Sequence, residues 1–326
     1  MTENYQKGEI MIKLKFMVFG LIFFVLASLH CQAANYSWTG TENNSWAESK
    51  NWNPNGIPGS GDNVNISSGT VECSAVFKIN NLTMSGGTLN ILSGKTLTIH
   101  GTYDLSGGTL GGGGSLNLNN RMNWTGGYMS GTGKTVIDAS ATLDIGGSSA
   151  KYLFEGRIIE NSGTVTCTGT GRIYGNNGSV LRNLSGGLID IRAEGLMFHY
   201  HSGTMPVIDN QGTFRQSAGT LTDIRWTFDN SATTQIETGT LELTAGGSHS
   251  GIFDISSAGI LLFNGGEYSI GNGVSFTGQG LPKVSSGTVT LEGAVSAKNF
   301  ELDGGTLNGT GTLTITSAFD WTGGHM

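Results

Sequence analysis

The chain has 326 residues, of which 54 are glycine and only 4 are proline, and its formal net charge is −7. Glycine at this frequency without a three-residue period excludes collagen, and the abundant Thr, Leu, Ile and Val argue against a disordered chain. The composition is typical of many short strands joined by tight turns, since glycine adopts the positive φ angles that such turns require. No run of basic residues could neutralise phosphates, so we expect no nucleic-acid partner.

Residues 1–33 have the pattern of a secretory signal peptide, with Met11 as an alternative start. Two lysines precede an apolar run over residues 16–29, and small residues suited to cleavage end at Ala33. The apolar run is too short for a membrane span. We therefore expect the protein to leave the cytoplasm, with no transmembrane span in the mature chain.

Residues 34–70 form a distinct block that contains Trp38, Trp46 and Trp52, half of the six tryptophans. Its residues follow the order W-T-G, W, N-W, P and D-x-V-x-I. This pattern resembles the opening of many secreted, repeat-rich surface proteins of Gram-negative bacteria, which are common in Bacteroidota. The resemblance extends from about Tyr36 onward. It implies a β-helix and a secreted or outer-cell-surface localisation in a Gram-negative bacterium, but no particular activity.

The segment 71–326 repeats itself at two scales. Residues 105–129 and 302–326 are identical at 13 of 25 positions without a gap, at an offset of 197. Residues 81–89 match 299–307 at an offset of 218. The two offsets differ by 21, which we interpret as the length of one turn of a solenoid. Between recurring G-T-L motifs, apolar and polar residues alternate with the period of two that is typical of strands.

We therefore predict an all-β fold, a parallel β-helix or β-solenoid with a tryptophan-rich N-terminal cap. At ~21 residues per turn, residues 71–326 would form about 12 turns stacked ~4.8 Å apart. The chain stops inside the second copy of the long repeat, so we interpret the sequence as a fragment. Cys73 and Cys167 would lie several turns apart, too far for a disulfide, and we expect both to be buried as small hydrophobic residues.

The tryptophan block has two interpretations. The first turn of a solenoid exposes the end of its apolar core and unpaired backbone groups, so the terminal block must differ from the interior repeats to cover them. Three large flat indoles suit this capping role. Alternatively, Trp38, Trp46 and Trp52 form a platform on which the rings of a glycan stack.

Two histidines are the one local indication of a metal site. His199 and His201 alternate in a strand pattern, which would place both imidazoles on the same side. No carboxylate or cysteine nearby completes a ligand set, and a surface His-x-His without a role is the alternative. The S-G-T-G-K-T stretch at 130–135 lacks the first glycine of a phosphate-binding loop, because Tyr128 occupies that position. We expect a turn there, and no cofactor.

A few charged residues would suit an enzyme. Enzymatic β-helices that cleave acidic polysaccharides place carboxylates and an Arg or Lys on neighbouring turns. The candidates here are Asp190, Arg192, Glu194, Arg215, Asp223 and Arg225. Such alternation is also typical of a solvated face, so we assign no catalytic residue.

The predicted function is that of a secreted or cell-surface, adhesin-like structural repeat protein. It would act by multivalent contact with glycans or with host or matrix surfaces, rather than as an enzyme. A polysaccharide lyase or hydrolase on the same fold is the alternative, since the fold does not determine function. Alternating threonines at 164–170 and 312–316 suggest an ice-binding solenoid as a minor alternative, although the variable repeat spacing disfavours it.

Overall fold

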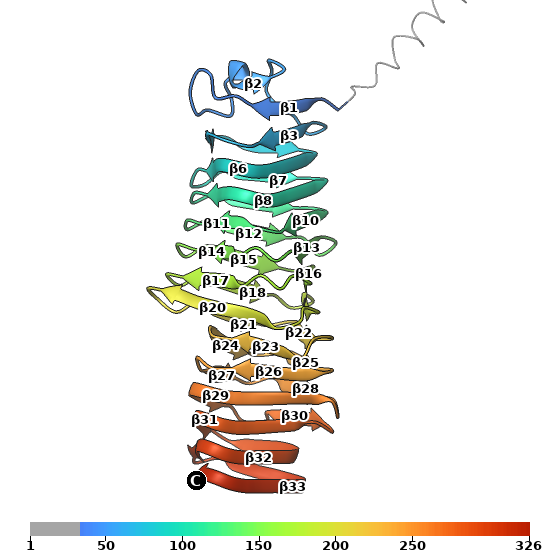
Figure 1. The fold of residues 1–326 in the computed structure, drawn as a ribbon, viewed down its shortest axis with the longest axis vertical. Coiled ribbons are helices and arrows are strands. Elements are labelled where there is room, and N and C mark those ends of the chain that lie inside the picture. The colour runs from blue at the N-terminus through green and yellow to red at the C-terminus, as the bar shows by residue number, and fades with distance from the viewer. Residues whose placement is uncertain (1–32) are drawn as a thin grey trace, which may run out of the picture. The chain divides into compact units, whose positions relative to one another are not determined.

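Three short strands per turn wind into a parallel β-solenoid (Figure 1). The computed structural model describes residues 33–326, so the predicted signal peptide, apart from Ala33, lies outside the described residues. Residues 35–326 form one unit, in which 33 strands join a single sheet of about 13 turns. The one helix of the described residues is the short 3-10 helix η1 (Ser49–Asn51). The predicted all-β solenoid is confirmed.

The solenoid has three sides, which we call face A, face B and face C in the order in which the chain visits them. Face A contains β1 (Asn35–Trp38), β3 (Asn63–Ile66), β10 (Arg121–Trp124), β13 (Thr142–Ile145), β16 (Thr164–Cys167), β19 (Leu188–Ile191), β22 (Thr213–Gln216), β25 (Thr233–Ile236), β28 (Ile252–Ile255) and β30 (Ser275–Gly278). Face B contains β4 (Thr70–Cys73), β11 (Gly127–Met129), β14 (Lys151–Leu153), β17 (Ile173–Asn176), β20 (Leu196–Ser202), β23 (Leu221–Ile224) and β26 (Gly239–Leu243). Face C contains β5 (Phe77–Ile79), β7 (Thr96–Ile99), β9 (Ser115–Leu118), β12 (Lys134–Ile137), β15 (Ile158–Asn161), β18 (Val180–Asn183), β21 (Val207–Asn210), β24 (Thr227–Asn230) and β27 (Gly247–His249).

Six longer strands bend around a corner and belong to more than one face. Faces A and B share β6 (Asn81–Ile91) and β8 (Thr102–Gly111), whereas faces B and C share β29 (Gly259–Ile270) and β31 (Leu281–Leu291). The last two strands, β32 (Ala294–Gly309) and β33 (Thr312–His325), follow all three faces.

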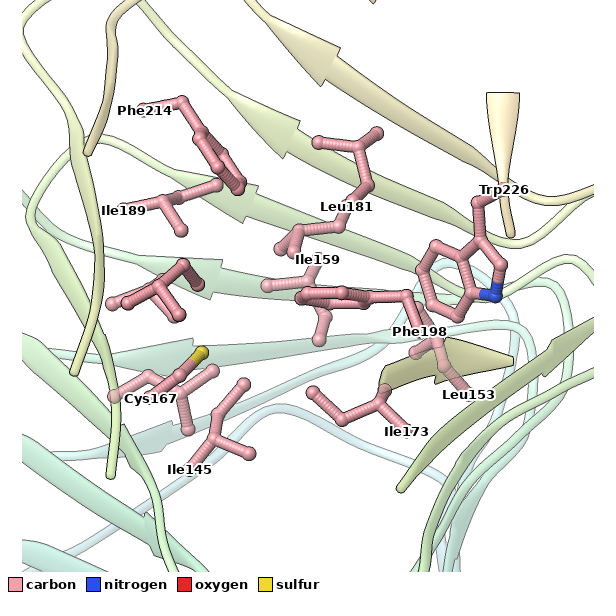
Figure 2. Close-up of a cluster of buried hydrophobic side chains, with 14 of the residues drawn as sticks. Ile145, Leu153, Ile159, Cys167, Ile173, Leu181, Ile189, Phe198, Phe214 and Trp226 are labelled. Atoms are coloured by element: carbon pink, nitrogen blue, oxygen red, sulfur yellow. The ribbon is translucent and has the colours of Figure 1, made fainter. Parts of the chain in front are cut away.

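Alternate residues of each strand point into the interior, which explains the period of two in the sequence. In β13, Leu143 and Ile145 are buried, whereas the other two residues lie outside. Figure 2 shows side chains from all three faces meeting in a narrow core. Cys73 and Cys167 are free and buried, as expected.

The turn length agrees with the predicted repeat. Asn81 accepts a hydrogen bond from the main-chain N–H of Thr102, which lies 21 residues later, on the next turn. From β3 onward, turns range from 18 residues, between Asn63 and Asn81, to 27 residues, between Asn183 and Asn210. The strands keep their length while the corners vary, so the register is preserved across insertions.

The two copies of the long repeat lie on different faces. Leu105 belongs to face A, where it pairs with Trp124, whereas the equivalent Leu302 belongs to face B, where it pairs with Trp321. The offset of 197 therefore corresponds to nine turns plus one further face.

Glycines allow the close stacking of the corners between faces A and B. Gly87 and Gly108 have φ angles of +69° and +80°, a region that favours glycine. A Cβ on Gly108 would lie 2.5 Å from the carbonyl oxygen of Gly87. Successive corners could not stack at this distance with any larger residue.

A ladder of buried asparagines joins four turns where face C meets face A. Asn161, Asn183 and Asn210 each donate a side-chain N–H to the side-chain oxygen of the next asparagine, at 2.8 Å in all three steps, and Asn230 is the last acceptor. The same three amides also donate to main-chain carbonyls of the face A strand one turn later, which satisfies groups that would be costly to bury alone. His249 follows Asn230 in this column, and neither of its ring nitrogens has a partner among the described residues. Burial lowers the pKa of His249 to about 3.

The three tryptophans of the first block pack together over the end of the core. Trp52 lies 4.8 Å from Trp38 and 4.9 Å from Trp46 between ring centroids. Trp46 also stacks on Phe77 of β5, at 5.3 Å. The indoles therefore contact the first strand of face C, as expected of a cap.

Asn51 holds the irregular loop of this block in place. Its side-chain oxygen accepts hydrogen bonds from the main-chain N–H groups of Glu42 and Asn43, and its amide donates to Asn43 and Ser45. Next to it, β2 (Trp52–Asn53) pairs antiparallel with β1. Parallel pairing between successive turns begins with β1 and β3 and continues from β3 to β6, so it starts inside the range expected for the cap.

Candidate functional site

The outward positions of face C form a continuous polar column. Because parallel strands stack in register, each turn adds one side chain to this column. From the N-terminal side its members are Glu160, Arg182, Asp209, Asp229, Ser248, Ser269, Thr290 and Asn308.

The upper part of the column is an ion-pair ladder. Lys134 lies 2.8 Å from Glu160, Arg182 lies 3.4 Å from the same carboxylate, and Arg182 also contacts Asp209 at 2.8 Å. Alternating charges thus compensate one another over four turns. Asp229, one turn further along, forms no ion pair with another described residue, and it accepts a hydrogen bond from the main-chain N–H of Ser248. The column therefore changes there from paired to unpaired charge.

A groove begins at this change. Two adjoining hollows of about 320 and 440 Å³ share Asp229, Ser248 and Ser269 in their walls. Asp209 lies at one end, and Glu267 and Glu292 lie at the other. No lysine or arginine is among the residues that line the two hollows. The groove is therefore negatively charged along the solenoid axis.

Its chemistry suits hydrogen bonding more than chemical reaction. Carboxylates only accept hydrogen bonds, whereas serine hydroxyls both donate and accept. The hydroxyls of Ser248 and Ser250 have no hydrogen-bond partner among the described residues, so a ligand can reach them. A polyhydroxylated or cationic chain complements this surface, and an acidic chain is repelled by it.

The predicted glycan platform of Trp38, Trp46 and Trp52 lies in the interior of the cap. These side chains are 7%, 0% and 2% exposed, respectively. The indole N–H of Trp52 donates to the main-chain oxygen of Trp46 at 2.8 Å. A sugar could stack on these rings only if the cap opened, so the geometry favours the capping interpretation.

His199 and His201 lie on one strand, β20, as predicted. Each packs on an aromatic ring, His199 on Tyr174 at 5.0 Å and His201 on Phe154 at 5.3 Å. Within residues 33–326, no group of three or more His, Cys, Asp and Glu side chains is placed to hold a metal ion. The fold brings no third ligand to this pair.

Asp190 is the centre of a charged cluster on face A. Its carboxylate is fully buried and accepts hydrogen bonds from Arg192, Ser217 and, through two nitrogens, Arg215. Burial alone would raise the pKa of Asp190, but the hydrogen bonds from Arg215, Ser217 and Arg192 hold it below its usual value. A carboxylate so fully engaged is a structural group, with no free oxygen for a substrate.

The remaining charged candidates are separate from this cluster. Arg225 contacts Asp223 at 2.8 Å on face B, and Glu194 accepts hydrogen bonds from Thr220. The structure therefore brings together Asp190, Arg192 and Arg215, but not the other three.

The threonine pattern is interrupted on the next turn. Thr164 and Thr166 pair with Leu188 and Asp190. An ice-binding face would need threonine at these positions on successive turns.

The face C column was not predicted from the sequence, although the sequence contains a signal for it. Four tetrapeptides, I-I-E-N, V-L-R-N, V-I-D-N and T-F-D-N, end in asparagine after an acidic or basic residue. The asparagines form the buried ladder, and the preceding residues Glu160, Arg182, Asp209 and Asp229 form the outward column. Their spacing of 20 to 27 residues follows the turn length.

No helix among residues 33–326 is both long and apolar enough to cross a membrane.

Comparison with known proteins gives one partial match. Neither the curated proteins nor the solved structures contain a match to the chain. A family described as a domain of unknown function, DUF8693, matches residues 37–176, less than half of the chain. The cap and the turns as far as β17 are thus similar to that family.

Proposed function

We propose that this chain is an exported repeat protein of the cell surface that works by multivalent contact with glycans or with host or matrix surfaces. The observation that carries this proposal is the face C column, in which successive turns repeat outward polar side chains beside an open groove. The signal-like segment at 1–33 supports export.

A stiff repeat suits this role for a thermodynamic reason. The hydrogen-bonded sheet fixes the positions of its outward groups, so binding orders few additional side chains. Several weak contacts on one rigid body together bind more tightly than any one of them alone. The first contact raises the effective concentration at which the others form. The groove charge favours neutral or amine-bearing glycans over acidic ones.

An enzyme on the same face is the second candidate, and one observation favours it. Arg182, Asp209 and Asp229 occupy the same position on three adjacent turns, beside the groove. Glycoside hydrolysis commonly uses two carboxylates on either side of the bond to be cleaved. The charge of the groove favours neutral polysaccharides as substrates and disfavours acidic ones.

One experiment distinguishes the two candidates. The purified protein is applied to a glycan array, and the same sample is assayed for release of reducing ends from neutral and acidic polysaccharides. Binding without turnover supports the contact role. Turnover that is lost in Asp229→Asn but kept in Asp254→Asn, an outward aspartate of face A, would instead establish the hydrolase. Absence of both binding and turnover contradicts both candidates.

A further inference from the structure

Face B carries a second column, which contains no charged residue over seven turns. The paired outward positions are Thr70, Thr88, Thr109, Tyr128, Tyr152, Tyr174 and His199. The column thus changes once from threonine to aromatic residues, between β8 and β11. In Figure 1 the aromatic part follows the edge marked by β11, β14, β17 and β20.

The aromatic rings cover one another. Tyr128 stacks on Tyr152 at 4.3 Å with an interplanar angle of 12°, and Tyr152 stacks on Tyr174 at 5.3 Å and 15°. His199 follows Tyr174 at 5.0 Å. Both ring faces of Tyr152 and of Tyr174 are therefore occupied by neighbours, and a ligand reaches only their edges.

Tyr128 differs because the stack ends there. Its neighbour on the preceding turn is Thr109, whose side chain is too small to cover a phenol ring. Tyr128 is accordingly 39% exposed, whereas Tyr152 and Tyr174 are half-buried. One face of the Tyr128 ring is thus open to solvent, on the side of the threonine residues. We call this exposed ring the ledge at Tyr128.

Polar groups lie on the two turns that precede Tyr128. The side chains of Thr88, Thr109 and Asn90 make no hydrogen bond to another described residue. Gly111 leaves space beside Thr109, and the Asn90 amide extends over it, since a Cβ on Gly111 would lie 2.6 Å from Asn90 Oδ1. The ring of Tyr128, two threonine hydroxyls and one amide thus lie on three successive turns of face B.

We propose that this part of face B binds one ring of an uncharged saccharide. The apolar C–H face of the sugar would lie on Tyr128, and its hydroxyls would bond Thr109 and Asn90. An aromatic surface with a few convergent polar groups is typical of small-ligand sites. An acidic ligand would be repelled, because the carboxylate of Glu72 lies beside Asn90 on the preceding turn of face B. The inference rests on the proposed function and gives it a ligand class and a site separate from the groove.

The test is calorimetric titration of the full protein with cellohexaose and mannohexaose, and with trigalacturonate as the acidic comparison. Tyr128→Thr continues the threonine column and should fold normally, which circular dichroism verifies. We expect it to weaken binding of at least one neutral oligosaccharide about tenfold or more, the effect of losing roughly 1.4 kcal/mol of contact. Tyr128→Phe keeps the ring and should bind within about twofold of the unaltered protein. Asp254→Asn, an outward residue of face A, should not change the affinity.

Equal affinity of Tyr128→Thr and the unaltered protein overturns this inference and leaves the proposed function standing. Binding of trigalacturonate as tight as that of the neutral chains also overturns it. If neither neutral oligosaccharide binds, the inference fails alone when the protein still adsorbs to glycan surfaces through face C. It fails together with the proposed function when that adsorption is absent as well.

Discussion

Replacing one asparagine of the buried ladder should destabilise the solenoid far more than replacing an outward one. Asn183 accepts a hydrogen bond from Asn161 at 2.8 Å, and it donates to Asn210 at 2.8 Å and to the main-chain oxygen of Thr213 at 3.0 Å. Asn183→Leu keeps a similar volume but removes all of these bonds. The side-chain oxygen of Asn210 then has no donor in a buried position.

The expected magnitude follows from these contacts. Leaving the buried side-chain oxygen of Asn210 without a donor costs about 1–3 kcal/mol, and the lost bonds of the neighbouring groups add about 1 kcal/mol or more. Burial of the added leucine carbons offsets about 1 kcal/mol. We therefore expect the free energy of unfolding to fall by about 2–4 kcal/mol, measured by urea denaturation with circular dichroism.

Asn117 provides the matched control. It lies on the outward side of face C, is half-buried and makes no side-chain hydrogen bond to another described residue. Asn117→Leu should change the free energy of unfolding by less than about 0.5 kcal/mol. Equal effects of the two substitutions would refute the ladder as a stabilising element. A double replacement of Asn183 and Asn210 should cost less than the sum of the single ones, because the two amides share a bond.

Three further predictions concern other buried positions. Gly108→Ala should destabilise the protein by about 2 kcal/mol or more beyond Gly94→Ala. Both glycines have a positive φ, but only an added Cβ on Gly108 would lie within 3 Å of backbone atoms of another turn. Urea unfolding of the two variants measures the difference. Below pH 6.5, His249 becomes protonated in the unfolded chain but stays neutral in the folded protein, where burial lowers its pKa to about 3. The free energy of unfolding should therefore fall by about 2 kcal/mol between pH 7 and pH 5. His249→Asn should abolish that loss, and an equal loss in this variant and the unaltered protein would contradict the assignment. Lys151 is fully buried, and among residues 33–326 its amine bonds only the main-chain oxygen of Gly147. Burial also lowers its pKa, so Lys151→Met should raise the melting temperature measured by calorimetry. A lower melting temperature would contradict this expectation.

Most of the fold was predictable because a solenoid repeats one local rule. Alternation identifies inward residues, and the difference between the two repeat offsets gives the turn length, as the pairing of Asn81 with Thr102 confirms. The sequence also indicated that the long repeat is displaced by one face, because its offset of 197 residues is not a whole multiple of the 21-residue turn. It was missed because alternation distinguishes inside from outside but not one face from another.

The candidate sites were less predictable for a related reason. Asp209 and Asp229 meet only because the corners between them keep successive turns in register. The ledge at Tyr128 depends on the small size of Thr109, which is adjacent in space but a full turn earlier in the chain. For the cap, no period applies, and the burial of Trp46 and Trp52 follows from irregular loops that only the structure resolves.

Charge reversal on one face at a time, measured by adsorption, tests most directly whether face C is the contact surface. The unaltered protein, Asp229→Lys in the groove and Asp254→Lys on face A are applied to chitosan-coated and pectin-coated surfaces. We expect tight adsorption to chitosan, weak adsorption to pectin, and at least about tenfold weaker chitosan binding for Asp229→Lys alone. Equal losses in both variants, or no adsorption by the unaltered protein, would contradict the claim that face C is the contact surface.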